Sequence, residues 1–119
     1  MTVRLKRAYE PPAKEDGHRV LVERLWPRGM KKESLQLDEW LKDISPSPEL
    51  RKWYGHELER WPEFQKRYAQ ELKQEPAREL LEKLVERARH GTLTLVFASK
   101  DEEHNSALLV KRELDKRLK

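Results

Sequence analysis

The sequence predicts an α/β fold, in which a small, mostly parallel sheet of three strands is flanked by about five helices. Two observations carry this prediction. Short runs of strand character occur near both ends of the chain, and a long stretch of helically spaced apolar residues separates them. Because a chain of 119 residues holds one modest core, residues 1–119 are expected to form a single domain.

Three segments have the pattern of β-strands. Residues 3–6 alternate apolar and basic side chains, as an outer strand does, whereas residues 19–25 and 92–98 are dominated by apolar side chains, typical of strands buried on both faces. The long helical crossover between the second and third strands predicts that these two run parallel. The direction of the first strand is left open, because Pro11 and Pro12 follow it and no helix is predicted there.

Five segments have the apolar spacing of helices. In the first, Leu37, Trp40, Leu41 and Ile44 lie three or four residues apart and form one helical face. The other four begin at Ser47, near Trp61, near Ala77 and near Asp101, and end at Gly55, near Leu72, before Gly91 and near Leu118. Ser99 with Glu102 matches a capping box for the last helix, and Asp101 is an alternative cap.

Composition excludes several classes of function. The chain has no cysteine, which excludes disulfides, thiolate catalysis and iron–sulfur ligation. Its four histidines lack metal-ligand spacing and no glycine-rich nucleotide motif occurs, so we expect neither a metal nor a cofactor. No apolar run has the length of a membrane span and the N-terminus lacks an apolar signal core, so we expect a cytoplasmic protein without a membrane partner.

The charge balance points weakly to anionic partners. Lysine and arginine number 26 against 22 acidic residues, which gives a net charge of +4 and a pI of about 9.4. Such an excess favours phosphates, carboxylates or nucleic acid. A surface solvated by charges of both signs is the simpler explanation of the same numbers.

The candidate binding site lies where the two parallel strands end. Ligands of open α/β sheets gather beyond the carboxyl ends of the strands, so the loops 23–29 and 99–105 should meet there. We expect an anion to be bound by basic and aromatic side chains of these loops, with Asn105 as a further ligand contact. The anchors are Arg24, Arg28 and Lys100, and Trp26 forms a wall of the site.

Asp101 and His104 are the candidate catalytic pair. Histidine is a common general acid or base in enzymes, and Asp101 can orient His104 or itself act as a base. Each of these residues also has a structural interpretation: Asp101 and Asn105 can cap the last helix, and Arg24 and Arg28 can form surface ion pairs. His104 alone can be an ordinary structural histidine.

The motifs resemble a known family. Residues 19–29, with the sequence Arg-Val-Leu-Val-Glu-Arg-Leu-Trp-Pro-Arg-Gly, resemble the signature of the YeaO-like proteins, grouped as a domain of unknown function, DUF488. Residues 6–12, 37–42, 49–56 and 100–105 are similar to other parts of that pattern, so the resemblance spans nearly the whole chain. It implies a small bacterial or archaeal protein without an established activity. Longer relatives carry a Cys-His-Arg segment where this chain has His104 and Asn105, and no cysteine is present here.

Three functional hypotheses follow. The leading one is a domain that binds or acts on a small anionic ligand bearing phosphate or carboxylate. The second is binding of nucleic acid through a basic face, and the third is a protein-interaction module that uses a helical face. Trp40, Trp53 and Trp61 lie on apolar helical faces, which favours core packing over stacking on bases. The sequence makes no prediction of the oligomeric state.

Overall fold

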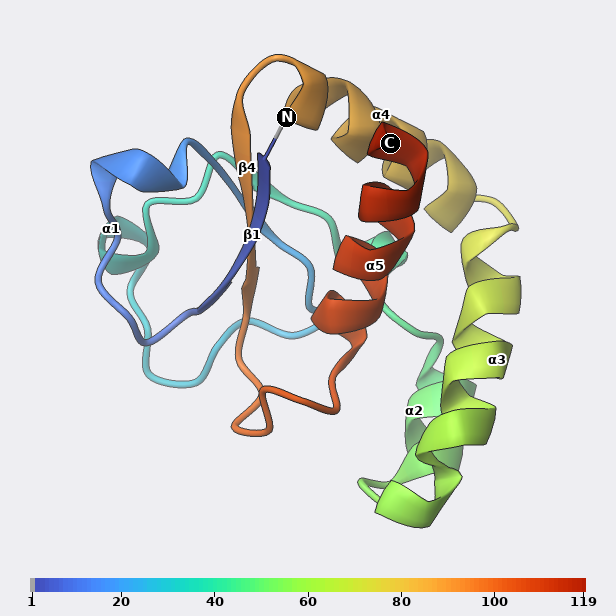
Figure 1. Ribbon diagram of the computed structural model, residues 1–119. Coiled ribbons are helices and arrows are strands. Elements are labelled where there is room, and N and C mark those ends of the chain that lie inside the picture. Colours follow the sequence, from blue (N-terminus) through green and yellow to red (C-terminus); the bar gives the residue numbers. More distant parts are fainter. Residues whose placement is uncertain (1) are drawn as a thin grey trace.

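The computed structural model describes residues 2–119 and contains a four-stranded sheet with five α-helices (Figure 1). The strands are β1 (Thr2–Arg7), β2 (His18–Leu21), β3 (Glu39–Trp40) and β4 (Thr92–Phe97). The α-helices are α1 (Lys32–Leu35), α2 (Pro48–Tyr54), α3 (Trp61–Leu72), α4 (Ala77–Arg89) and α5 (Ser106–Leu118). The short 3₁₀ helices are η1 (Lys14–Asp16), η2 (Lys42–Ile44) and η3 (Leu58–Arg60).

The sheet is parallel throughout, with the strand order β1-β4-β2-β3. β4 is central: it pairs with β1 from Thr92 to Phe97 and with β2 from Leu93 to Val96. The predicted parallel pairing of the second and last strands is therefore confirmed, and β1 has the same direction. The prediction of three strands is wrong, because β3 adds a fourth strand at the edge of the sheet beside β2.

One predicted helix is also wrong: the segment that carries Leu37, Trp40, Leu41 and Ile44 forms β3 followed by η2. The amide of Leu41 donates to the carbonyl of Leu21 in β2 at 2.9 Å, so the chain extends along the sheet here. Leu37 and Trp40 pack in one hydrophobic cluster, whereas Leu41 and Ile44 pack in the other. A helical stripe requires one common face, and the sheet divides these residues between two.

Both faces of the sheet are covered. The larger core lies between the sheet and α2–α5 and includes Leu93, Leu95 and Phe97 of β4 (Figure 1). The smaller core lies on the opposite face, where Val96 packs with Leu35 of α1. Successive side chains of a strand point to opposite faces, so β4 contributes to both cores in turn.

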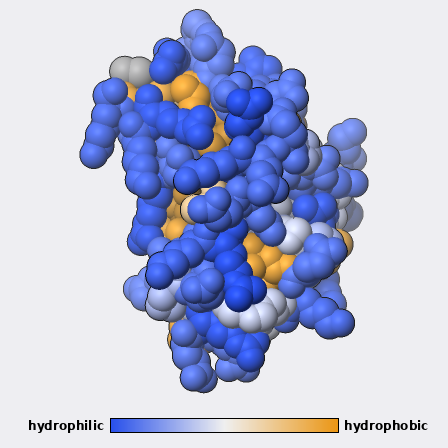
Figure 2. Space-filling model, turned by 90° about the vertical axis from the view of Figure 1, so that its right-hand side faces the viewer, coloured by the Kyte–Doolittle hydropathy of each residue, from blue (hydrophilic) through white to orange (hydrophobic). Residues whose placement is uncertain are grey.

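The apolar stripes of the long helices are turned inward, as their spacing predicts. In α4, Leu81, Leu84 and Ala88 are completely buried, and in α3 Tyr68 is almost completely buried. The outer face formed by these helices and α5 is mainly hydrophilic, with apolar side chains in separate small patches (Figure 2).

The structure confirms the predicted boundaries of α2 but not the start of α5. The Ser47 hydroxyl accepts the amide of Leu50 at 3.1 Å at the beginning of α2, and Gly55 ends that helix in the left-handed conformation with a φ of 53°. α5 begins at Ser106 rather than near Asp101, and its N-cap is Asn105. The predicted capping box is therefore wrong.

Side-chain hydrogen bonds to the backbone explain the late start of α5. The Ser99 hydroxyl accepts the amide of Asp101 at 3.2 Å, and Asp101 Oδ1 accepts the amides of Glu103 and His104 at 3.0 Å each. Such local bonds hold the backbone in turns and compete with helical geometry. Asn105 Oδ1 then accepts the amide of Leu108 at 2.8 Å, and the helix begins.

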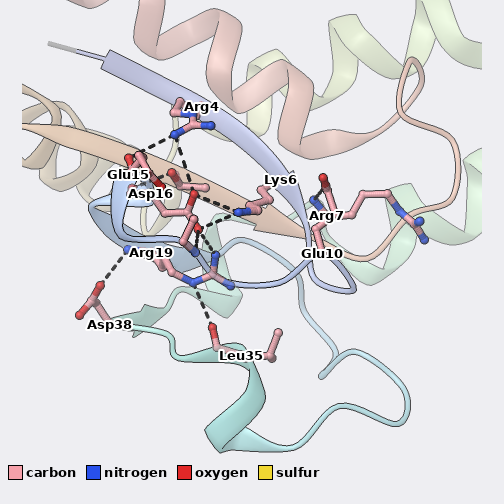
Figure 3. A network of polar contacts seen from close by, with 11 residues as sticks. Arg4, Lys6, Arg7, Glu10, Glu15, Asp16, Arg19, Leu35 and Asp38 are labelled. Atoms are coloured by element: carbon pink, nitrogen blue, oxygen red, sulfur yellow. Dashed lines mark hydrogen bonds and ion pairs between the residues drawn. The ribbon is translucent and has the colours of Figure 1, made fainter.

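A buried ion network ties η1 to β1 and β2 (Figure 3). We call Lys6, Asp16 and Arg19 the Asp16 network. The Asp16 carboxylate is completely buried and accepts hydrogen bonds from Arg19 Nη1 at 2.6 Å and from Lys6 Nζ at 3.1 Å. Arg19 Nε donates to the carbonyl of Leu35 at 3.0 Å, which ties the network to α1. The turn into β2 needs Gly17, since a side chain there would lie 2.4 Å from the carbonyl oxygen of Thr92.

Candidate functional site

The two loops that follow β2 and β4 are neighbours. The amide of Val22 donates to the carbonyl of Val96 at 3.1 Å, and the amide of Ala98 donates to Glu23 Oε1 at 3.1 Å. The parallel pairing of β2 with β4 brings both carboxyl ends to the same edge of the sheet. This edge is where the sequence places a candidate site.

A pocket of about 400 Å³ opens at this edge. α2, α3 and the start of α5 supply most of its remaining wall. We call it the strand-end pocket and define it by Glu23, Arg51, Tyr54, Trp61, His104 and Asn105. Its volume lies within the range of about 300–1,000 Å³ in which proteins enclose small ligands.

Asp101 orients His104 at the rim of the pocket. The Asp101 carboxylate lies 3.0 Å (Oδ2) and 3.2 Å (Oδ1) from His104 Nδ1, and it also accepts the amides of Glu103 and His104. Burial tends to raise the pKa of Asp101, but these hydrogen bonds outweigh it and hold that pKa below its usual value. Because Nδ1 faces the carboxylate, Nε2 is the ring atom left to meet a ligand.

Glu23 is a half-buried carboxyl in the wall of the pocket. Burial raises its pKa above the usual value, and neither the hydrogen bond from Ala98 nor the nearby charge of Arg51 offsets that effect. Glu23 was not among the site residues predicted from the sequence. The available signal was its position directly after the buried residues 20–22, at the end of a central strand.

Aromatic rings form the wall opposite the strand ends. Trp61 and Phe64 of α3 have ring centroids 5.5 Å apart at an angle of 17°, and Tyr54 of α2 lies 4.6 Å from Phe64. Trp61 also contacts the ring of His104 edge-on, with the centroids 5.3 Å apart. Of the three tryptophans predicted on helical faces, Trp61 lines the pocket, and it also packs against the larger core.

Positive charge reaches the pocket from α2. Arg51 and Lys52 are both exposed at its rim, and His56 follows just beyond the helix. No ion pair joins either Arg51 or Lys52 to an acidic side chain within residues 2–119. These cations lie in the long helical segment between β2 and β4, for which the sequence predicts helical packing and no ligand contact.

The predicted anchor Arg24 lies behind the pocket wall. Its Nη2 donates to the carbonyls of Ser45 and Pro46 at 3.4 Å each, and its Nη1 lies 3.6 Å from Asp43. Ser45 and Pro46 themselves line the pocket. Arg24 therefore supports the wall from outside.

The other predicted residues lie in several places. His104 and Asn105 line the strand-end pocket, while Trp26 lines a second, more open hollow and packs against Trp40 with ring centroids 5.3 Å apart. Arg28 is exposed in the turn, where its carbonyl accepts the hydroxyl of Tyr9. Lys100 is exposed in the loop before α5. The structure thus brings the Asp101–His104 pair together with Glu23 and leaves Trp26 in a different hollow.

Neither a metal cluster nor a membrane-spanning helix is found among the described residues. Across residues 2–119, no group of three or more acidic or histidine side chains is arranged to hold a metal ion. None of the helices in that range is both long enough and apolar enough to cross a lipid bilayer.

Comparison with known proteins assigns the family. Residues 2–119 match a family model described as an inactive DUF488-N3 subclade. The uncharacterised protein YeaO of Escherichia coli is 42% identical over 110 residues, which cover 92% of this chain and 94% of YeaO. The chain belongs to the YeaO-like DUF488 family.

Two mycobacterial proteins are similar to the chain over a shorter stretch. The uncharacterised protein Rv3073c of Mycobacterium tuberculosis is 46% identical over 86 residues, which cover 72% of this chain and 73% of that protein. The uncharacterised protein Mb3100c of Mycobacterium bovis matches to the same extent. No solved structure matches the chain.

Proposed function

We propose that this YeaO-like protein binds a small anionic ligand in the strand-end pocket. The observation that carries the proposal is the position of His104, whose ring is oriented by Asp101 at a pocket that Arg51 and Lys52 border. A ligand phosphate or carboxylate can accept hydrogen bonds from such groups.

Arg51, Lys52 and His56 in this proposal replace the anchors that the sequence suggests. Arg24 is engaged with backbone carbonyls and Asp43, and Arg28 and Lys100 are exposed on loops outside the pocket lining. The start of α5 also borders the pocket, and the Asn105 side chain already accepts the Leu108 amide there.

Binding without turnover is the form of the proposal that the comparisons support. The matched family model is described as an inactive subclade. Asp101 and His104, which the sequence suggests as an acid–base pair, then act as an oriented hydrogen-bonding group for the bound anion. The pair keeps its geometry whether or not a reaction follows.

A titration followed by nuclear magnetic resonance tests the proposal. Labelled protein is titrated at constant ionic strength with phosphate, sulfate and succinate, while the amide signals of Glu23, Arg51 and His104 are followed. We expect saturable shifts at these residues for at least one of the anions. The variant His104→Ala should weaken that binding about tenfold, which corresponds to the loss of one hydrogen bond to a charged group.

His90→Ala is the matched control. His90 also pairs with a carboxylate, Glu86, at 2.8 Å, but it is exposed at the end of α4 and away from the pocket lining. Its substitution should leave the affinity unchanged. Shifts scattered over the whole basic surface, equally affected by both variants, would show non-specific ion binding and refute the proposal.

A further inference from the structure

We infer that the anionic ligand of the strand-end pocket is a ribonucleoside monophosphate. This inference rests on the proposed function and adds the class of ligand. It comes from three different surfaces in one pocket: a wall of aromatic rings, a half-buried carboxyl with an open oxygen, and a rim of unpaired cations.

The aromatic wall suits a planar ring. Trp61 is partly exposed, and Phe64 and Tyr54 support it from the core with centroid distances of 5.5 and 5.9 Å to its ring. Pro46 and Pro48 add apolar surface to the same pocket. A nucleobase of any kind presents a flat face that packs on such rings.

The carboxyl of Glu23 suits a pair of hydroxyl donors. Its Oε1 accepts the Ala98 amide at 3.1 Å, and its Oε2 has no hydrogen-bond partner within residues 2–119. A half-buried carboxyl needs donors to compensate for lost hydration. The vicinal hydroxyls of a ribose supply such donors, as acidic side chains beside bound ribose do in other nucleotide sites.

The cationic rim suits a phosphate. Arg51 and Lys52 are adjacent on α2, and His56 lies just past its end, all three in the lining of the pocket. No acidic side chain within residues 2–119 pairs with Arg51 or Lys52. Free cations at a pocket raise the local concentration of anions and can bond to phosphate oxygens directly.

Simpler anions use only part of this pocket. A sugar phosphate would leave the rings around Trp61 without a partner, and an aromatic carboxylate would offer Glu23 no hydroxyl donors. The pocket volume of about 400 Å³ also exceeds what inorganic phosphate fills. A ribonucleoside monophosphate carries a base, a diol and a phosphate in one molecule of suitable size.

Calorimetric titration with dissected ligands tests the inference. Adenosine and uridine 5′-monophosphates are compared with the corresponding nucleosides, with the 2′-deoxynucleotides and with ribose 5-phosphate. We expect at least one ribonucleotide to bind about tenfold or more tightly than ribose 5-phosphate, its nucleoside and its 2′-deoxy form.

Two variants assign the subsites. Glu23→Gln, which can keep the hydrogen bond from Ala98 through its amide oxygen, should remove the preference for ribose over deoxyribose. Arg51→Gln should remove the advantage of the nucleotide over its nucleoside. Arg89→Gln, an exposed charge change at the end of α4, is the control and should alter neither ratio.

The outcomes separate this inference from the proposed function. If inorganic phosphate or ribose 5-phosphate binds at the His104 pocket as tightly as every nucleotide, the nucleotide assignment is overturned while anion binding stands. If no anion of any kind shifts the pocket signals, both fail. Should Glu23→Gln alter the fold, the comparison of ribonucleotide with deoxynucleotide on the unaltered protein still decides whether the diol is recognised.

Discussion

Asp16 and Glu23 are both carboxyls withdrawn from water, yet their surroundings shift their pKa values in opposite directions. Burial disfavours the charged form of each. At Asp16, hydrogen bonds from one backbone amide and two cationic side chains outweigh burial, and the pKa is lowered. At Glu23, one amide hydrogen bond and the charge of Arg51 do not outweigh it, and the pKa is raised.

The difference separates a structural cluster from the cluster that we propose binds a ligand. The Asp16 network is enclosed, and its acid is matched by cations at 2.6 and 3.1 Å. In the strand-end pocket, no ion pair within residues 2–119 joins Glu23 to Arg51 or Lys52, and all three side chains line the open pocket. Compensated charges hold elements together, whereas uncompensated charges at a pocket cost stability and are available to a ligand.

The largest expected effect is on the Asp16 side of this comparison. Asp16→Ala leaves Arg19, whose side chain is 4% exposed, and the mostly buried Lys6 without their carboxylate. The free energy of unfolding should fall by about 3–5 kcal/mol, because a buried charge is left unpaired. Urea denaturation at pH 7 measures the change.

The control and the pH dependence sharpen this prediction. Glu63→Ala breaks the exposed pair with Arg67 and should cost no more than about 0.5 kcal/mol. Because the pKa of Asp16 is lowered by folding, its contribution to stability is present above the ordinary Asp pKa and is lost as the pH falls through the folded value. The Ala variant should therefore lose less stability on acidification than the unaltered protein; equal losses would contradict the role given to Asp16.

An intermediate effect is expected at Asn105, the pocket residue with a structural role. Asn105→Ala removes the N-cap of α5 and should lower the free energy of unfolding by about 1 kcal/mol. Asn105→Asp keeps an acceptor for the Leu108 amide and should retain most of the stability. Thermal denaturation followed by circular dichroism compares the two, and an equal loss in both would show that the cap is not what Asn105 contributes.

The smallest effect is expected at Glu23, and its sign is opposite. Glu23→Gln should raise the free energy of unfolding at pH 7 by about 0.5–1 kcal/mol, since it removes a charge that the folded protein solvates poorly. Because the pKa of Glu23 is higher in the folded protein, ionising Glu23 lowers the free energy of unfolding as the pH rises from the ordinary Glu pKa through the folded-state pKa. Denaturation across the mildly acidic range should show the advantage of the variant appearing with rising pH. If Glu23→Gln instead lowers the free energy of unfolding, the Glu23 carboxylate stabilises the fold as Asp16 does, and the prediction is wrong.

Local patterns predicted the fold better than they predicted the pocket. The boundaries of α2 follow from Ser47 and Gly55, and the buried stripe of α4 follows from its apolar spacing. The apolar spacing from Leu37 to Ile44 predicted a helix where the chain forms β3 and η2. The same spacing of four apolar residues also fits a chain that crosses from one face of a sheet to the other.

The two loops that the sequence names do lie at one edge of the sheet, and a pocket opens there, but much of its lining comes from other segments. Parallel strand ends had to bring residue 23 near residue 98, and Glu23 indeed accepts the Ala98 amide. Arg51 and Trp61 come from helices whose placement no local pattern specifies. The roles of Arg24, Trp26, Arg28, Lys100, Asp101 and His104 in binding or chemistry stay predictions.

By itself the sequence determined the parallel α/β class, most helices and the edge at which a pocket forms, because apolar periodicity and turn residues act between neighbours in the chain. Only the tertiary structure decided that β3 joins the sheet and that Arg51 and Trp61 line one pocket with Glu23 and His104. These features depend on contacts between distant segments, whose geometry is set by packing both faces of the sheet at once.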